Sequence, residues 1–178
     1  MEVKKIELWP PKCKTLKESI TILGTGSNLG DKKINLQTAA TWIAERVGEI
    51  VQKSGYYLTD AWGNLDQPVF WNQVLVVKTY LAPSVVLDTI LEIERDMGRI
   101  RRIKWGERLI DIDLLFYDDV VLDTPLLQIP HPFLQDRNFV LAPLLEIQPD
   151  WMHPILNKSV RELALLSTDP LKAVRLAD

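Results

Sequence analysis

The sequence predicts a single α+β domain preceded by a short arm. The chain has 178 residues, of which 47% are hydrophobic, so it is long enough to bury one substantial core. Strand-like segments alternate with two segments of helical periodicity, and residues 19–178 contain no internal repeat, low-complexity tract or linker. Residues 1–18 have no clean period and contain consecutive prolines at Pro10 and Pro11, so we expect an arm ahead of the domain.

The first part of the predicted domain is strand, helix, strand. Residues 20–23 form an apolar stretch that predicts a strand, and Asp31 is placed to cap a helix over residues 32–46. The apolar side chains on one stripe of this helix are Leu36, Ala39, Ala40, Ile43 and Val47. Gly48 ends the helix, and residues 49–57 predict a second strand.

The second part repeats a strand, helix, strand order. Residues 58–68 are rich in turn formers and predict a loop, whereas the β-branched and aromatic residues 69–80 predict a strand. Pro83 begins a second helix, which Gly98 ends, and residues 108–117 predict the next strand. The order β-α-β-β-α-β is the split βαβ pattern of ferredoxin-like domains. Beyond it we expect an added hairpin with a proline-rich connection, at residues 118–132, and short C-terminal helices at residues 140–146 and 159–166.

Composition excludes several classes of protein. The formal net charge of -3 argues against nucleic-acid binding, which needs a strong positive excess. The single cysteine, Cys13, excludes an intramolecular disulfide. The first residues are charged and lack the apolar core of a signal peptide, and no apolar run approaches the length of a membrane span. We therefore expect a cytoplasmic protein that binds neither nucleic acid nor a membrane. Nothing in the composition requires an oligomer.

Residues 108–117 carry a pair of aspartates on one face of a strand. Ile110, Ile112, Leu114 and Phe116 recur at every second position, so Asp111 and Asp113 leave on the opposite face. Two like charges on one face repel each other, and Mg²⁺ bound between them would relieve that repulsion. A solvent-exposed strand face is the commoner explanation of an isolated pair, so the pair alone does not decide.

A basic segment directly before the aspartates shifts the interpretation towards phosphate chemistry. Its cations are Arg99, Arg101, Arg102, Lys104 and Arg108. Arginine donates bidentate hydrogen bonds to phosphate oxygens, while a metal ion neutralises the charge on them. Trp105 lies inside this segment, where a large aromatic needs something to pack against. Together these residues favour an ATP-type phosphoryl transfer site over a solvated surface.

Two other motifs receive weaker interpretations. The glycine-rich residues 24–31 match neither a Walker A loop nor the dinucleotide fingerprint, so we predict a tight turn capped by Asp31. Phe70 and Asn72 share one strand face, where a planar heterocycle could stack on the ring and bond to the amide, although core packing also explains the aromatic residues here. His131 and His153 each precede a proline and have no adjacent nucleophile, so they do not indicate Ser-His or Cys-His catalysis.

Four segments in the same order resemble the 6-hydroxymethyl-7,8-dihydropterin pyrophosphokinase family of folate biosynthesis. They are GSNLGD at residues 26–31, DQPVFWN at 66–72, KWGERLIDIDLL at 104–115 and IPHPFLQDRNFVLAPLLEI at 129–147. The resemblance implies a ferredoxin-like fold, ATP as co-substrate and two Mg²⁺ ions. It also implies transfer of the β,γ-diphosphate of ATP to the pterin hydroxymethyl group, with release of AMP.

The resemblance also implies roles for individual residues, carried over by matching position. Asp111 and Asp113 would hold both metal ions, and together with Arg99 and Arg108 they form the expected catalytic set. The residues expected to contact ATP are Glu94, Arg101, Lys104, Trp105, Arg108, His131 and Arg137. The residues expected to contact the pterin are Thr59, Asn72, Phe70 and Phe139, with the pterin ring between the two phenylalanines.

The sequence departs from the family pattern at several positions and leaves two rivals open. Lys104 replaces a frequent arginine, Glu107 a frequent proline, and Asp60 and Trp62 a typical proline and aliphatic residue. One rival is another Mg²⁺-dependent transferase whose aspartate pair holds a nucleotide sugar. The other is a ferredoxin-like ligand-binding module without chemistry. Production of AMP from ATP and the hydroxymethyl-dihydropterin separates all three.

Overall fold

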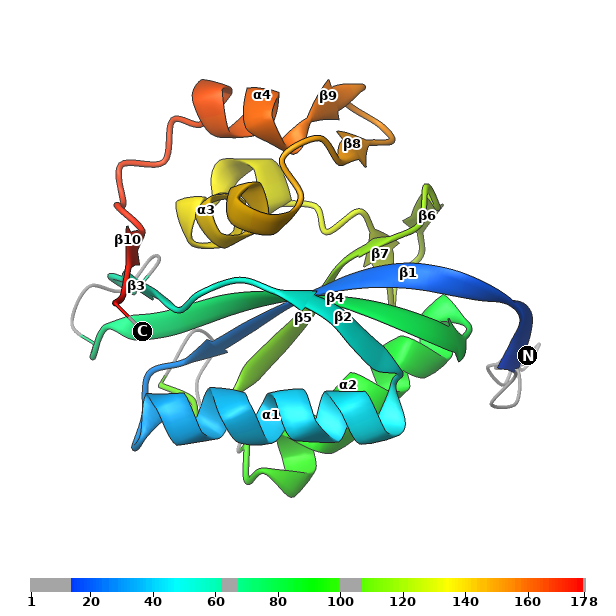
Figure 1. The fold of residues 1–178 in the computed structure, drawn as a ribbon, viewed down its shortest axis with the longest axis horizontal. Coiled ribbons are helices and arrows are strands. Elements are labelled where there is room, and N and C mark those ends of the chain that lie inside the picture. Colours follow the sequence, from blue (N-terminus) through cyan, green and yellow to red (C-terminus); the bar gives the residue numbers. More distant parts are fainter. Residues whose placement is uncertain (1–13, 62–66, 100–106, 178) are drawn as a thin grey trace, which may run out of the picture.

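A computed structural model describes residues 14–61, 67–99 and 107–177 of the chain. They form a mixed α/β fold in three layers, with an antiparallel sheet between two pairs of helices (Figure 1). Helices α1 (Lys32–Arg46) and α2 (Pro83–Asp96) cover one face of the sheet. Helices α3 (Asn138–Ile147) and α4 (Val160–Leu166) lie over the other face, with α3 next to the sheet.

The sheet is built around two long central strands. Its order is β10 (Val174–Arg175), β3 (Tyr57–Thr59), β4 (Phe70–Leu81), β1 (Lys14–Ser27) and β5 (Asp111–Tyr117), and β2 (Glu49–Lys53) also pairs with β4. Every pairing is antiparallel. β1 begins at Lys14, before its predicted start, so the last residues of the predicted arm pair with the sheet.

The two helices under the sheet agree with the sequence predictions. α1 spans the predicted residues, and the Asp31 carboxylate accepts the backbone N–H of Ile34 at 3.0 Å, as expected of an N-cap. Pro83 is the first residue of α2, and Gly98 follows the helix with a φ of +90°, a conformation that favours glycine. The predicted apolar stripe of α1 packs against the sheet in one core, together with the buried residues Val86, Ile90 and Ile93 of α2.

The sheet separates two hydrophobic cores, because neighbouring strand residues face opposite ways. Leu23 belongs to the core between the sheet and helices α1 and α2. Its neighbour Ile22 belongs to the core between the sheet and helices α3 and α4. In β4, Val77 and Val76 divide in the same way. Both faces of the central strands are therefore buried over much of their length, and β1 and β4 form the base of the site.

Three predicted features of the sheet are wrong in detail. The predicted strand over residues 49–57 divides into β2 and β3, and β5 begins at Asp111 instead of residue 108. Ile22 pairs with Phe116 and Leu23 with Leu114, so the register skips Leu115 in a β-bulge. As a result Phe116 lies in the core on the side of α3 and α4, whereas Ile112 and Leu114 lie in the other core. The prediction that these three side chains share one face is wrong for Phe116.

The C-terminal part adds small elements to this frame. The predicted hairpin is present as β6 (Leu122–Asp123) and β7 (Gln128–Ile129), and α3 and α4 lie close to their predicted bounds. The 3-10 turn η1 (Leu134–Asp136), the hairpin of β8 (Met152–His153) and β9 (Lys158–Ser159), and β10 were not predicted. Among the described residues, no helix has the length and apolar character needed to cross a bilayer.

Candidate active site

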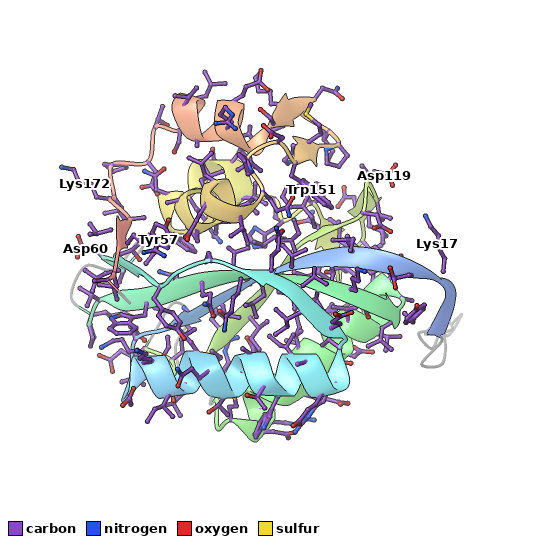
Figure 2. All side chains as sticks on the ribbon, viewed as in Figure 1. Lys17, Tyr57, Asp60, Asp119, Trp151 and Lys172 are labelled. Carbon is purple, nitrogen blue, oxygen red and sulfur yellow. The ribbon has the colours of Figure 1, made fainter. Side chains whose placement is uncertain are left out.

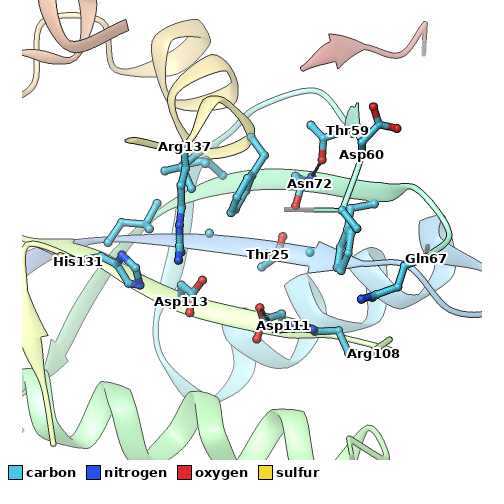
Figure 3. A pocket seen from close by; sticks show the side chains of 18 of the residues that line it. Thr25, Thr59, Asp60, Gln67, Asn72, Arg108, Asp111, Asp113, His131 and Arg137 are labelled. Atoms are coloured by element: carbon cyan, nitrogen blue, oxygen red, sulfur yellow. Dashed lines mark hydrogen bonds and ion pairs between the residues drawn. The ribbon is translucent and has the colours of Figure 1, made fainter. Parts of the chain in front are cut away.

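A cavity of about 280 Å³ lies between the sheet and the N-terminal end of α3 (Figure 3). Its walls come from β1, β3, β4, β5 and the start of α3, and also from the segments before β5 and around His131. The predicted site residues that line it are Thr59, Phe70, Asn72, Arg99, Arg108, Asp111, Asp113, His131, Arg137 and Phe139. Glu94 lies behind this wall, and Arg101, Lys104 and Trp105 fall outside the described residues.

The aspartate pair faces the cavity, as the alternation of β5 predicts. Asp111 and Asp113 project from the same side of the strand, and Arg137 extends towards Asp113 from the direction of α3 (Figure 3). In the neighbouring strand β1, Gly26 pairs with Asp111 and Gly24 with Asp113. Since glycine has no side chain, the sheet beside both carboxylates stays open to the cavity.

The positions of Gly24 and Gly26 show that the prediction of a tight turn over residues 24–31 is partly wrong. Both were assigned to a tight turn, but both are part of β1, and the turn begins only after Ser27. A Cβ atom on Gly26 would lie 2.9 Å from Oδ1 of Asn72. The two glycines lie two residues apart, as the two aspartates do. This spacing is the signal in the sequence that could have identified them as part of a strand beside the site.

Two arginines neutralise Asp111. Nη1 of Arg99 lies 2.6 Å from one carboxylate oxygen and Nη1 of Arg108 lies 2.6 Å from the other. Arg99 also forms an ion pair with Glu94. These side chains are only partly exposed, so the attraction between them is less screened than on an open surface. The arginines are therefore held at the edge of the cavity with their charges beside the aspartate pair.

Glu94 supports the strand that carries the aspartates. It is 2% exposed, and its Oε1 accepts the backbone N–H of Ile112, which lies between Asp111 and Asp113, at 2.7 Å. Burial raises the pKa of Glu94, while Arg99 and the Ile112 N–H oppose that shift. Its carboxylate is thus engaged by groups of this chain, on the far side of the wall from the cavity.

The electrostatics of the site distinguish Asp113 from its neighbours. Burial, and then repulsion by Asp111, raise the pKa of Asp113 to about 7, although Arg137 and Arg99 oppose the shift. Burial, followed by the nearby Arg137 cation, lowers the pKa of His131 to about 4, so this imidazole is neutral at pH 7. A negative charge on Asp113 is thus costly even beside these arginines, and His131 adds no charge of its own.

The other end of the cavity is aromatic and amide-rich. Phe70 and Phe139 both line it, with the Arg108 guanidinium 5.9 Å from the Phe70 ring and the Arg137 guanidinium 5.6 Å from the Phe139 ring. Nδ2 of Asn72 donates to Oγ1 of Thr59 at 2.9 Å, which orients the amide. Gln67, Asp60 and Ala61 also line the cavity but were not predicted as site residues.

The donor set suits a metal ion that brings further ligands with it. Within the described residues, no group of three His, Cys, Asp or Glu side chains is placed to hold a metal ion. Two carboxylates on one strand face, beside space for phosphate oxygens and water, are instead the usual protein contribution to a Mg²⁺ site. Asp111 and Asp113 therefore fit Mg²⁺ that binds together with a polyphosphate.

Comparison with known proteins identifies the family that this chain resembles. The family model for 7,8-dihydro-6-hydroxymethylpterin-pyrophosphokinase matches residues 22–149, which include every described residue of the predicted site. The 2-amino-4-hydroxy-6-hydroxymethyldihydropteridine pyrophosphokinase of Aquifex aeolicus is 46% identical over 140 residues, covering 79% of this chain and 87% of its own. The folic acid synthesis protein of Schizosaccharomyces pombe is 38% identical over 93% of this chain, which matches only 22% of that longer protein.

Solved structures give the same fold. A Plasmodium falciparum HPPK-DHPS structure with pteroate aligns with a TM-score of 0.70 and 19% sequence identity, covering 89% of this chain and 43% of the longer chain. A second structure, with STZ-DHP, aligns with a TM-score of 0.66 over 84% of this chain and 41% of the other. With the family model spanning most of the domain and a relative at 46% identity, the chain belongs to the 7,8-dihydro-6-hydroxymethylpterin-pyrophosphokinase family.

Proposed function

We propose that the cavity is where this pyrophosphokinase of folate biosynthesis transfers the β,γ-diphosphate of ATP to 6-hydroxymethyl-7,8-dihydropterin and releases AMP. One observation carries the assignment: a single cavity joins a carboxylate pair and arginines to a wall of two phenylalanines and an oriented amide. The first set matches a Mg²⁺-polyphosphate and the second a flat heterocycle.

Asp111 and Asp113 are the residues that would hold two Mg²⁺ ions. Bound Mg²⁺ would neutralise charge on the phosphate oxygens during transfer. Asp113 is suited to this role because its raised pKa reflects the cost of holding a negative charge there, even beside Arg137 and Arg99, when no metal ion is bound. The glycines opposite in β1 leave room beside both carboxylates for phosphate groups.

Arg99, Arg108 and Arg137 are the described cations proposed to bind the phosphates. All three line the cavity close to the aspartate pair, and guanidinium groups donate paired hydrogen bonds to phosphate oxygens. His131 would contribute a neutral N–H: its Nδ1 accepts the backbone N–H of Phe133 at 3.3 Å, which leaves the proton on Nε2. Arg101, Lys104 and Trp105 remain predicted ATP contacts that lie outside the described residues.

The pterin is proposed to lie between Phe70 and Phe139. Stacking between two aromatic rings suits a planar bicycle, and the Asn72 amide can bond to the edge of the ring system. Thr59 holds that amide by accepting one of its N–H groups, so the carbonyl oxygen of the amide keeps a defined direction. Glu94, predicted as an ATP contact, is better supported as a residue that positions β5.

The ferredoxin-like arrangement is part of the proposal. In the sheet, β4 lies between β1 and β2, β5 lies on the other side of β1, and α1 and α2 cover one face. This supports the split βαβ topology and leaves the opposite face open for the site, beneath α3. Only small-molecule substrates are needed for the proposed reaction.

The direct test is incubation of the purified protein with ATP, MgCl₂ and 6-hydroxymethyl-7,8-dihydropterin, followed by chromatography of the nucleotides. We expect AMP to form in proportion to pterin diphosphate and to require both the pterin and Mg²⁺. Formation of ADP instead, or tight ligand binding without turnover, would exclude the proposed reaction.

A further inference from the structure

The C-terminal residues 167–176, which we call the strap, join the two walls of the pterin end of the cavity. The strap leaves α4, passes the N-terminal end of α3 and ends as β10 at the edge of the sheet (Figure 1). It lies beyond residues 22–149, which the family model matches. None of its side chains is fully buried, so hydrogen bonds hold it in place more than apolar burial does.

At one end the strap caps helix α3. The N-cap residue of α3, Arg137, makes no side-chain capping hydrogen bond. Oδ2 of Asp169, from far along the chain, accepts the backbone N–H of Asn138, the first residue of the helix, at 2.7 Å. A carboxylate at this place satisfies one of the free N–H groups of the helix and is favoured by the helix dipole.

The side chain of Asn138 completes this junction. Its Nδ2 donates to the carbonyl oxygens of Asp169 and Leu171, both at 2.9 Å, and Oδ1 of Asp169 accepts the N–H of Leu171 at 3.0 Å. Asn138 lies between Arg137 and Phe139, and both of these line the cavity. Fixing the backbone at Asn138 therefore fixes the directions in which its two neighbours enter the site.

At its other end the strap pairs with β3, the opposite wall. Val174 pairs with Leu58 and Arg175 with Tyr57, and the N–H of Leu176 donates to the carbonyl of Tyr56 at 2.8 Å. Leu58 precedes Thr59, which lines the cavity and bonds to Asn72. The strap thus connects the wall that carries Phe139 to the wall that carries Thr59.

A second set of contacts fastens α3 to the same edge. The carboxylate of Glu146, near the end of α3, contacts Nε of Arg175 at 3.2 Å and accepts the N–H of Gly55 at 3.0 Å. Burial and a hydrogen bond with Glu146 raise the pKa of Tyr57 to about 12, so the phenol stays protonated in this junction. Tyr57 lies in the space between α3 and the sheet (Figure 2).

We infer that Asp169 is a positioning residue for the pterin subsite, acting through Asn138 on the direction of Phe139 and the spacing of the two walls. The role rests on the proposed function, in which the pterin stacks against Phe139. Asp169 itself does not line the cavity. Its effect should therefore fall mainly on the pterin. Of the arginines proposed to bind phosphate only Arg137 adjoins Asn138, whereas Arg99 and Arg108 are held by Asp111.

The test compares Asp169→Ala with Lys172→Ala, an exposed strap residue whose side chain points away from the fold (Figure 2). Pterin affinity would be measured by fluorescence with a non-hydrolysable ATP analogue and Mg²⁺ present, beside ATP affinity, turnover and melting temperature. For Asp169→Ala we expect pterin Kd and KM to rise roughly three- to tenfold, as for loss of one or two hydrogen bonds. ATP Kd should stay within about twofold. Lys172→Ala should resemble the parent protein.

Two results would overturn the positioning role. One is unchanged pterin affinity in Asp169→Ala, and the other is an equal loss of pterin and ATP affinity with a lowered melting temperature, which would indicate a purely structural contact. If the alanine variant does not fold, Asp169→Asn keeps the shape but turns one carboxylate oxygen into a donor, and the same comparison applies. Failure of the parent protein itself to form AMP would instead refute the proposed function.

Discussion

The carboxylate of Glu94 in α2 accepts the backbone N–H of Ile112 in β5 at 2.7 Å, directly between the two aspartates of the site. The same carboxylate pairs with Arg99, which also contacts Asp111. A buried glutamate in the supporting helix therefore fixes both the strand that carries the aspartates and one of the arginines beside them. These contacts explain how β5 keeps a defined geometry although two carboxylates of like charge project from one of its faces.

Replacing Glu94 by alanine should destabilise the protein by about 3–5 kcal/mol, because it leaves a buried N–H and a partly buried guanidinium without their shared acceptor. The free energy of unfolding would be measured in urea. Asp88→Asn, at an exposed position of the same helix, is the control and should change stability by less than about 0.5 kcal/mol. A stable Glu94→Ala protein that has lost only ATP affinity would support a direct nucleotide contact instead.

Replacing Asp113 by asparagine should lower turnover by orders of magnitude, because half of the carboxylate charge available to Mg²⁺ is removed while side-chain size is kept. AMP release at saturating MgCl₂ is the measurement. Asp119→Asn, in the exposed turn after β5, serves as the matched control (Figure 2) and should leave turnover unchanged. Normal turnover of a folded Asp113→Asn protein would end the assignment of Asp113 to the metal site.

The same substitution should change how stability depends on pH. The pKa of Asp113 is raised from 3.8 to about 7 in the folded state, so ionising it weakens the fold as pH rises through this interval, and the cost is complete above about pH 7. Without Mg²⁺, Asp113→Asn should match the parent near pH 4 and exceed its melting temperature at pH 8. Equal melting temperatures at pH 8 would contradict the raised pKa.

Removing the Phe70 ring should weaken pterin binding by about 1–3 kcal/mol, the usual value of stacking a base on an aromatic side chain. ATP affinity should change little, and both dissociation constants would be measured by fluorescence titration. Trp71→Ala is an adjacent control, because Trp71 faces the opposite core and contacts Tyr56 with ring centroids 5.8 Å apart. Trp71→Ala should lower stability and spare the pterin, whereas equal losses for both ligands in Phe70→Ala would contradict stacking.

Adding a methyl group at Gly26 should also impair pterin binding, because the new Cβ would lie 2.9 Å from Oδ1 of Asn72. The amide would have to move away from Thr59, and we expect pterin Kd to rise about tenfold, as for one or two lost hydrogen bonds. In Gly24→Ala the new Cβ meets only the Leu115 side chain, at 3.4 Å, so pterin affinity should hold. Similar pterin affinity in the two variants would show that the Asn72 position does not matter.

Local patterns in the sequence determined the elements that depend on short-range geometry. The bounds of α1, the start of α2 at Pro83 and the face shared by Asp111 and Asp113 follow from helix caps and from the two-residue period of a strand. These features need no knowledge of distant residues. The four motifs likewise identify the family, since a motif is a property of the chain order alone.

Only the tertiary structure decided features that depend on which distant segments meet. The bulge at Leu115 is set by pairing with β1, and it moves Phe116 to the other core. Glu94 can accept the backbone N–H of Ile112 because α2 packs against β5, and no local pattern in the sequence reveals this packing. Asp169 reaches Asn138 because the strap folds back over α3. Such contacts join residues far apart in the chain, so they are fixed by the packing of the whole domain and leave no periodic signal in the sequence.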